Sequence, residues 1–289
     1  MAEPCRQCPR RCGADREAAR GFCGAPGQAV VARAAPHYGE EPCISGTRGS
    51  GTVFFSGCGL RCVFCQNHEI SRGCAGRRVT VPQLRGIFLR LRDAGVHNIN
   101  LVTPSHYIGL LAEALSGLEL GIPVVWNSSG YDSAGRLRQL EGLVQVYMPD
   151  LKYSDAELAR RLSDAPDYPQ TALEAIREMY RQTGPFELDG DGIMRRGLLI
   201  RHLVLPGEVE NTLGVIDMIE DNLPAGKIMF SLMSQYTPMP GLDAFPGLRR
   251  TVTRQEYERC LSYLDFSAIE FGYCQDPESA GTEMIPDFS

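Results

Sequence analysis

Strand-like and helix-like segments alternate along most of the chain, and this alternation limits the possible folds more than any other feature. Short apolar runs predict strands at 52–56, 98–102, 123–127, 143–148, 198–205, 227–232 and 268–273. Helical spacing of apolar residues predicts helices at 80–94, 107–118, 134–140, 154–162, 171–182, 209–222 and 254–264. This order predicts an α/β fold whose parallel strands are joined by right-handed crossovers. In such folds the site lies at the carboxyl ends of the strands.

The composition is that of an ordinary globular protein. Apolar residues make up 43% of the 289 residues and charged residues 22%, which is enough for one large domain with or without an appendage. The net charge of −6 gives no bulk attraction to nucleic acid or to anionic lipid. The first residues contain no apolar stretch of a signal peptide, and no run approaches the roughly 20 apolar residues of a membrane helix. We therefore expect a cytoplasmic protein with neither nucleic acid nor membrane as a partner.

Eleven cysteines are many for a cytoplasmic protein, and metal ligation explains them better than disulfides in a reducing compartment. They fall into two groups and a remainder. The groups are Cys5, Cys8, Cys12 and Cys23, and then Cys58, Cys62 and Cys65. The remaining four are expected to be small buried residues without a ligand role, and they are Cys43, Cys74, Cys260 and Cys274.

The second group has the spacing C-x3-C-x2-C in a loop directly after the first predicted strand of the alternating region. Thiolates are the standard ligands of iron–sulfur clusters. A cubane cluster has four irons, so three cysteines leave one iron open, which suits chemistry better than electron transfer alone. The alternative is a zinc site in which His68 or a distant cysteine supplies the fourth ligand.

The first group has the spacing C-x2-C-x3-C-x10-C, which provides four ligands and therefore a closed site. Such a set suits structural zinc or a second, fully ligated iron–sulfur cluster. Unligated thiols are the alternative. We expect residues 1–52 to form a Cys-rich, loop-rich appendage, whose arginines belong to a solvated surface. Those arginines are Arg6, Arg10, Arg11, Arg16 and Arg20.

The segment Ser56–Asn67 resembles the cluster-binding loop of the radical SAM (S-adenosylmethionine) superfamily. The cysteine spacing, the position of Phe64 before the last cysteine and the place after the first strand all agree with that loop. Three more segments, at the ends of the third, fourth and fifth predicted strands, resemble pyruvate formate-lyase activating enzyme and its uncharacterised relatives with a Cys-rich N-terminus. They are Asn127–Tyr131, Tyr147–Tyr153 and Arg201–Gly207.

The resemblance implies a partial TIM-like (β/α)6 barrel at residues 53–289, with a C-terminal extension, behind the appendage of residues 1–52. It also implies a [4Fe–4S] cluster on Cys58, Cys62 and Cys65 that reductively cleaves S-adenosylmethionine. The resulting 5′-deoxyadenosyl radical would then abstract hydrogen from a substrate. An electron donor such as flavodoxin or ferredoxin would reduce the cluster. The cofactors supply this chemistry, while the protein orients the reactants and excludes water.

The resemblance also assigns roles to individual residues. Lys152 would meet the SAM carboxylate, and Arg201 would help to hold SAM. A monovalent cation near SAM would be held by Asp150, Met148, Asn127 and Ser128. An aspartate with carbonyl and hydroxyl oxygens suits a hard cation, and a lysine or arginine suits a carboxylate. The further residues expected to bind the cofactor are Phe64, Thr103, Ser128 and Gln235.

The turn after the second predicted strand departs from the family pattern. Relatives commonly have Gly-Gly-Glu there, contacting the SAM amine, whereas this chain has Thr103-Pro104-Ser105-His106-Tyr107. Thr103 and Ser105 are the candidate acceptors for the amine. His106 is expected either to touch substrate or SAM or to be a satisfied structural histidine.

The leading hypothesis is an oxidoreductase that acts on a protein or peptide, in the manner of the activators that place a radical on a glycyl radical enzyme. One alternative is a radical SAM maturase or small-molecule enzyme without a glycyl radical partner. Another is a non-catalytic iron–sulfur protein that binds metal or transfers electrons. Fold-level resemblance does not decide between these substrates.

Overall fold

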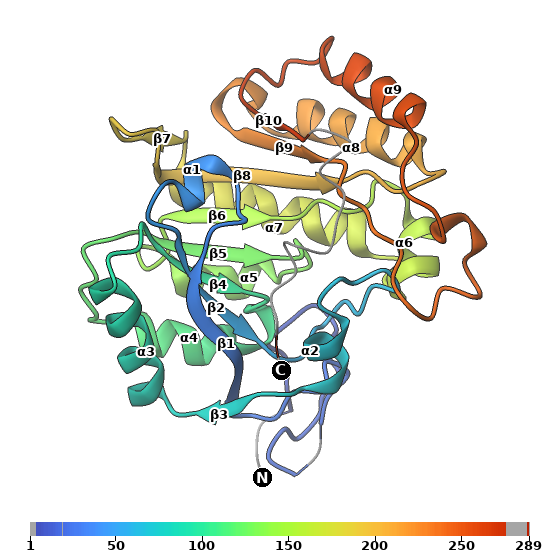
Figure 1. Ribbon diagram of the computed structural model, residues 1–289. Helices are drawn as coiled ribbons and strands as arrows, with labels where there is room; N and C mark the ends of the chain where they lie inside the picture. The colour runs from blue at the N-terminus through green and yellow to red at the C-terminus, as the bar shows by residue number, and fades with distance from the viewer. Residues whose placement is uncertain (1–3, 19, 276–287, 289) are drawn as a thin grey trace.

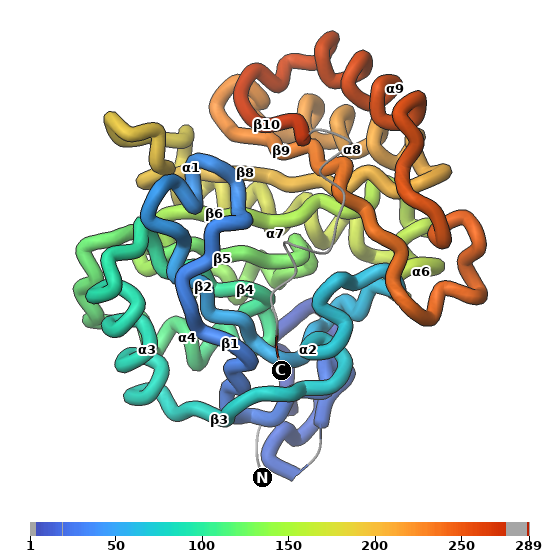
Figure 2. The backbone as a smooth tube through the Cα atoms, viewed as in Figure 1, coloured from blue at the N-terminus to red at the C-terminus, as the bar shows by residue number. Residues whose placement is uncertain are grey.

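The computed structural model describes residues 4–18, 20–275 and 288 (Figures 1 and 2). Within these residues, parallel strands form the centre of one sheet in the order β2-β4-β5-β6-β8-β9-β10. They are β2 (Ser50–Phe55), β4 (Ile99–Val102), β5 (Val124–Ser128), β6 (Val146–Pro149), β8 (Met194–Leu203), β9 (Met229–Met233) and β10 (Gly272–Cys274). Each matches a strand predicted from the sequence, although β10 is shorter than predicted. The chain therefore has the predicted α/β, partial TIM-like barrel fold.

Three further strands run antiparallel to their neighbours. They are β1 (Ala29–His37), β3 (Arg77–Val79) and β7 (Glu187–Leu188). β1 pairs with β2 between His37↔Ser50 and Val31↔Phe55, so part of the expected loop-rich segment belongs to the sheet. Strand β1 was not predicted because its sequence has no alternating apolar pattern. Only its first three residues are buried, and the rest includes Pro36 and several alanines.

The predicted helices cover the outer face of the parallel strands (Figure 1). They are α3 (Val81–Asp93), α4 (Ile108–Leu115), α5 (Ala134–Leu137), α6 (Ala156–Ser163), α7 (Tyr168–Thr183), α8 (Val209–Asn222) and α9 (Arg254–Leu264). Thr80 and Thr253 begin α3 and α9 with capping boxes, in which Gln83 and Glu256 return a hydrogen bond to the backbone N–H of the cap. Among the described residues, no helix combines the length and the apolar character needed to cross a bilayer.

Two short helices that the sequence did not predict, α1 (Pro42–Ser45) and α2 (His68–Gly73), lie near the barrel interior and the cysteine loop. Cys43 and Ile44 of α1 pack against inward-facing apolar residues of the parallel strands. Those residues are Val125, Val146, Met148, Met194, Leu199 and Met229. Residues on one strand alternate between the two faces, so Asn127 and Arg201 also face inward, two residues beyond Val125 and Leu199. The interior thus changes from apolar to polar toward the carboxyl ends of the strands.

Candidate functional site

A cavity of about 230 Å³ lies at the carboxyl ends of the parallel strands. Its wall contains all three cysteines of the loop after β2 and most of the other residues that were expected to bind the cofactor or the cation, but not Met148, Ser105 or His106. The residues of this set that line the cavity are Cys58, Cys62, Phe64, Cys65, Thr103, Asn127, Ser128, Asp150, Lys152, Arg201 and Gln235. They come from the ends of six strands, β2, β4, β5, β6, β8 and β9, and their convergence follows from the parallel order of those strands.

The cysteine loop offers three thiols in a largely buried setting. Cys58 and Cys62 are buried, and Cys65 is half-buried. The Cys58 sulfur accepts a hydrogen bond from Leu60 N (3.4 Å), and the Cys65 sulfur accepts one from the Ser71 hydroxyl (3.6 Å). Burial and the neighbouring Cys62 thiol raise the pKa of Cys58 to about 12. Deprotonation here therefore needs a compensating positive charge, which bound metal supplies.

Contacts from three parts of the chain hold this loop in place. Val63 N donates to Leu162 O of α6 (2.9 Å), and Arg72 of α2 donates to Cys62 O (3.1 Å). Arg10 Nε donates to Gly59 O (2.8 Å). The prediction that Arg10 belongs to a solvated surface is therefore wrong, because its side chain binds the cysteine loop.

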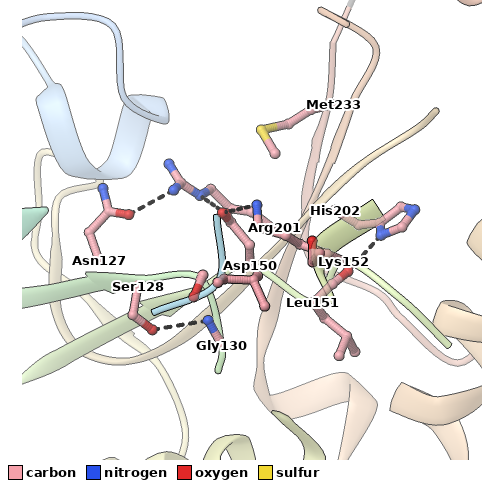
Figure 3. A network of polar contacts seen from close by, with 12 residues as sticks. Asn127, Ser128, Gly130, Asp150, Leu151, Lys152, Arg201, His202 and Met233 are labelled. Carbon is pink, nitrogen blue, oxygen red and sulfur yellow. Dashed lines mark hydrogen bonds and ion pairs between the residues drawn. The ribbon is translucent and has the colours of Figure 1, made fainter. Parts of the chain in front are cut away.

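Asp150 is the centre of an ion-pair network in the cavity wall (Figure 3). Its Oδ2 lies 2.7 Å from Lys152 Nζ, and its Oδ1 lies 3.0 Å from Arg201 Nε. Burial opposes ionisation of the carboxyl, but the two cations outweigh it and lower the pKa of Asp150. Burial favours the neutral amine of Lys152, but Asp150 and the Cys62 and Cys65 thiols outweigh burial. The pKa of Lys152 is therefore raised. The ammonium and the cysteine thiols thus line the same cavity.

Arg201 is held by groups from three separate elements. Besides Asp150, its Nη2 donates to Asn127 Oδ1 (2.7 Å) and its Nη1 pairs with Glu40 Oε2 (2.9 Å). Glu40 also accepts hydrogen bonds from Asn100 and Asn127 through Oε1 (3.0 and 3.1 Å). Glu41 Oε2 lies 3.8 Å from Arg201 Nη1 without a hydrogen-bond partner, and burial raises the pKa of Glu41. No motif marks these two glutamates in the sequence.

The turn that carries Asp150 and Lys152 is fixed by its backbone. Leu151 N donates to Arg201 O (2.8 Å), and His202 Nδ1 donates to Leu151 O (2.6 Å). His202 Nε2 in turn accepts from the Thr212 hydroxyl of α8 (2.9 Å), and burial lowers the pKa of His202 to about 4. A Cβ at Gly130, which has φ +73°, would lie 2.2 Å from Asp150 O, so only glycine fits there.

Thr103 occupies the place of the family's Gly-Gly-Glu turn in an unusual conformation. It has φ +57°, which is strained for a β-branched residue, and its N–H donates to Asn127 O (2.9 Å). Such strain is concentrated at functional sites. The neighbouring His106 does not line the cavity. Its Nε2 donates to Ser56 O (2.9 Å), and burial lowers its pKa to about 3, as for a structural histidine.

The other residues that were predicted to bind the cofactor each contact a different part of the cavity wall. The Ser128 hydroxyl donates to the buried Asp132 carboxylate. Gln235 is tied to the cysteine loop, because its carbonyl oxygen accepts from Gln66 Nε2 (3.4 Å). Phe64 packs against Tyr153 and Tyr236, with ring centroids 6.5 and 6.2 Å apart. His68, the alternative fourth ligand for zinc, does not line the cavity.

The other cysteines are placed partly as expected. Cys43 and Cys260 are buried and Cys74 is half-buried, whereas Cys274 is exposed, so the expectation of burial is wrong for Cys274. Over residues 4–18, 20–275 and 288, no three or more His, Cys, Asp and Glu side chains are arranged to hold a metal ion as they stand. The donor set of the cavity nevertheless suits an iron–sulfur cluster with a zwitterionic ligand, since it joins three thiols to two cations.

The sequence model of the radical SAM superfamily matches residues 52–218, which is more than half of the chain. The uncharacterized protein MJ0674 of Methanocaldococcus jannaschii is 31% identical over 279 residues, covering 93% of this chain and 76% of that protein.

Two solved structures share the fold. SuiB of Streptococcus suis has a TM-score of 0.51 at 16% identity, covering 76% of this chain and 47% of that one. HydG, a maturase of the [FeFe]-hydrogenase, has a TM-score of 0.51 at 15% identity, covering 80% of this chain and 53% of that one. The chain thus spans about half the length of either protein, and the likeness concerns the fold alone.

Proposed function

The chain belongs to the radical SAM superfamily, and we propose that it holds a [4Fe–4S] cluster on Cys58, Cys62 and Cys65. When bound, the reduced cluster would cleave S-adenosylmethionine to methionine and a 5′-deoxyadenosyl radical, which abstracts hydrogen from the substrate. The observation that carries this proposal is that the three thiols share one cavity with Lys152 and Arg201. The three thiols suit an iron–sulfur cluster, and the two cations suit the carboxylate of a ligand bound beside it.

We propose that Lys152 binds the SAM carboxylate. Its ammonium shares one cavity with the Cys62 and Cys65 thiols, so a ligand of a cluster on these thiols would come within its reach. Arg201 keeps its place through Glu40, Asp150 and Asn127 and so offers a pre-oriented positive charge. Fixed donors of this kind spare the cost of reorganisation on binding. Thr103 would accept from the SAM amine, and Phe64 would provide an apolar wall that excludes water.

A monovalent cation at Asp150 is part of this proposal. Both carboxylate oxygens of Asp150 have a partner, one in Lys152 and one in Arg201. When Lys152 turns to the SAM carboxylate, Oδ2 is left free. Together with oxygens of Met148, Asn127 and Ser128, it would form the oxygen-rich set that a hard cation prefers.

The substrate is proposed to be a protein or peptide, and in particular a glycyl radical enzyme. The resemblance of the segments around Asp150 and Arg201 to those of activating enzymes supports this choice. The electron is proposed to come from a flavodoxin or ferredoxin. A stable glycyl radical doublet in the electron paramagnetic resonance (EPR) spectrum of a candidate partner, after incubation with the loaded enzyme, SAM and reductant, would support it. Turnover of a small molecule without such a doublet would favour the maturase or small-molecule alternative.

Direct binding of SAM to the cluster tests the core of the proposal. We expect SAM to change the EPR spectrum of the reduced, cluster-loaded protein, because the amino and carboxyl groups would bind the open iron. The same titration with S-adenosylhomocysteine is a matched comparison, since that molecule keeps both groups but lacks the sulfonium charge. A spectrum that stays unchanged at saturating SAM would contradict the proposal and would favour a non-catalytic cluster.

A further inference from the structure

The N-terminal cysteines lie directly against the loop of Cys58. Cys58 N donates to Cys23 O (3.2 Å). A side chain at Gly57, which has φ +88°, would place its Cβ 2.8 Å from that same carbonyl oxygen, so only glycine permits this approach. Cys8 Sγ lies 3.4 Å from the position that a Cβ of Gly59 would occupy. The segment is therefore packed on the site, and Figure 2 shows its blue trace beside α2.

The four N-terminal thiols are gathered in one place. Cys12 Sγ and Cys23 Sγ lie 3.0 and 3.9 Å from one point, the position that a Cβ would take at Gly21. The chain around Cys5 is closed by two backbone hydrogen bonds, from Cys5 N to Ala14 O and from Gly13 N to Cys5 O (both 3.1 Å). Arg11 N donates to Cys8 O (3.1 Å), next to Cys12. The turns that carry the four cysteines thus lie together against the Cys58 loop.

Arginines tie the segment to the barrel, contrary to the expectation of a solvated surface. Arg10 donates to Gly59 O and to Ser163 O (2.8 and 2.7 Å). Arg16 donates to His106 O (2.5 Å) and to Ala25 O (3.3 Å). Among the described residues of 4–28, few apolar side chains are buried. The segment therefore has no hydrophobic core of its own, and hydrogen bonds are its main visible support. Small segments of this kind commonly obtain their folding energy from a bound metal.

We propose that Cys5, Cys8, Cys12 and Cys23 form a closed four-thiolate metal site that fixes the position of the Cys58 loop. The site takes zinc or a second iron–sulfur cluster, both of which four cysteines complete. Among the described residues, neither these four thiols nor those of Cys58, Cys62 and Cys65 surround a single metal position. Side-chain rotation on metal binding therefore completes each of the two sites. The proposal does not depend on the substrate or on the SAM chemistry.

The test counts metal in the full-length protein after anaerobic purification and desalting with a chelator. Cys62→Ser removes one ligand of the catalytic cluster and leaves the N-terminal site intact. We expect this variant to retain about one zinc or about four irons per chain, and the two results distinguish the two metals. The double variant Cys12→Ser, Cys62→Ser should lose that metal. Equal, near-zero metal in both variants would overturn the proposal.

The positioning role has a separate readout. Cys12 is exposed, so Cys12→Ser changes packing little. It should raise the amide hydrogen-exchange rate of residues 57–62 about tenfold, whereas Cys274→Ser, at another exposed cysteine, should leave that rate unchanged. Unchanged exchange after loss of the metal would overturn the positioning role. Metal retained by Cys62→Ser in a protein whose wild type never cleaves SAM would uphold this site while contradicting the proposed function.

Discussion

Asp150 and Lys152 form an ion pair across a single turn, with Oδ2 and Nζ 2.7 Å apart, while Arg201 holds the other carboxylate oxygen at 3.0 Å. Leu151 lies between them and is anchored through both its N–H and its carbonyl. The turn therefore holds the Asp150 carboxylate between two cations, one from the same turn and one from strand β8. The roles proposed for Lys152 and Asp150 rest on this arrangement.

Replacing Lys152 by alanine should weaken SAM binding roughly 10- to 100-fold, because a hydrogen-bonded charge pair contributes about 1.5–3 kcal/mol. The chain offers a matched control in Lys227, its only other lysine, which is exposed. Equilibrium binding of SAM to the cluster-loaded protein is the measurement. Equal affinities of Lys152→Ala and Lys227→Ala would contradict the role of Lys152.

Replacing Glu40 by alanine should lower the free energy of unfolding by about 2 kcal/mol, because Arg201 and two asparagines lose an acceptor in a buried setting. Urea unfolding measures the change. The control is Glu69→Ala at an exposed position, which should change the free energy by less than about 0.5 kcal/mol. A loss of similar size in both variants would show that Glu40 has no special place in the network.

Gly130→Ala should disrupt the site, because the new Cβ would lie 2.2 Å from Asp150 O at a residue with positive φ. We expect a loss of stability above about 3 kcal/mol, or no folded protein. Gly135→Ala is the matched control, since nothing lies within 4 Å of its Cβ position and it is in helix α5. That change should be neutral or slightly stabilising, by about 0.4–1 kcal/mol. Thermal and urea unfolding compare the two variants.

Stability should fall as the pH drops below about 6.5, because two buried histidines are neutral in the folded chain. Burial lowers the pKa of His106 to about 3 and that of His202 to about 4. The unfolded chain binds these protons near pH 6.5, so their stabilising effect is complete above that pH and is lost as the pH falls toward 4 and 3. Each histidine contributes a slope of up to about 1.4 kcal/mol per pH unit.

The histidine contributions can be removed without losing every hydrogen bond. Asparagine at 202 replaces the Nδ1 donor to Leu151, and glutamine at 106 replaces the Nε2 donor to Ser56. His202→Asn and His106→Gln should each flatten the dependence of the unfolding free energy on pH between 6.5 and 4.5. Unfolding curves with the wild-type slope in both variants would mean that other groups cause the acid sensitivity.

Much of the fold was predictable from the sequence, because apolar periodicity directly reflects which face of an element is buried. The bounds of α8 and α9 agree with the predicted helices at 209–222 and 254–264. Asp150, Lys152 and Arg201 were singled out by the family resemblance, and the structure brings them together in one cavity at the carboxyl ends of the strands.

What the sequence did not show depends on contacts between distant segments. Glu40 reaches Arg201 across 161 positions, and Arg10 reaches Ser163 across 153; neither residue lies in a motif. His202 stands beside a recognised arginine, but its role depends on Leu151 and Thr212. Strand β1 was missed because its burial comes from pairing with β2 and not from an alternating pattern.

The central claim is reductive cleavage of SAM at the Cys58–Cys65 loop, and one measurement tests it most directly. Anaerobically purified, iron-reconstituted protein is reduced with dithionite and incubated with SAM, and the products are separated by chromatography. Wild type and the exposed-cysteine control Cys274→Ser should both form 5′-deoxyadenosine and methionine, whereas Cys62→Ala should form neither. Zinc in place of iron after anaerobic handling, or equal product from Cys62→Ala and wild type, would contradict the claim.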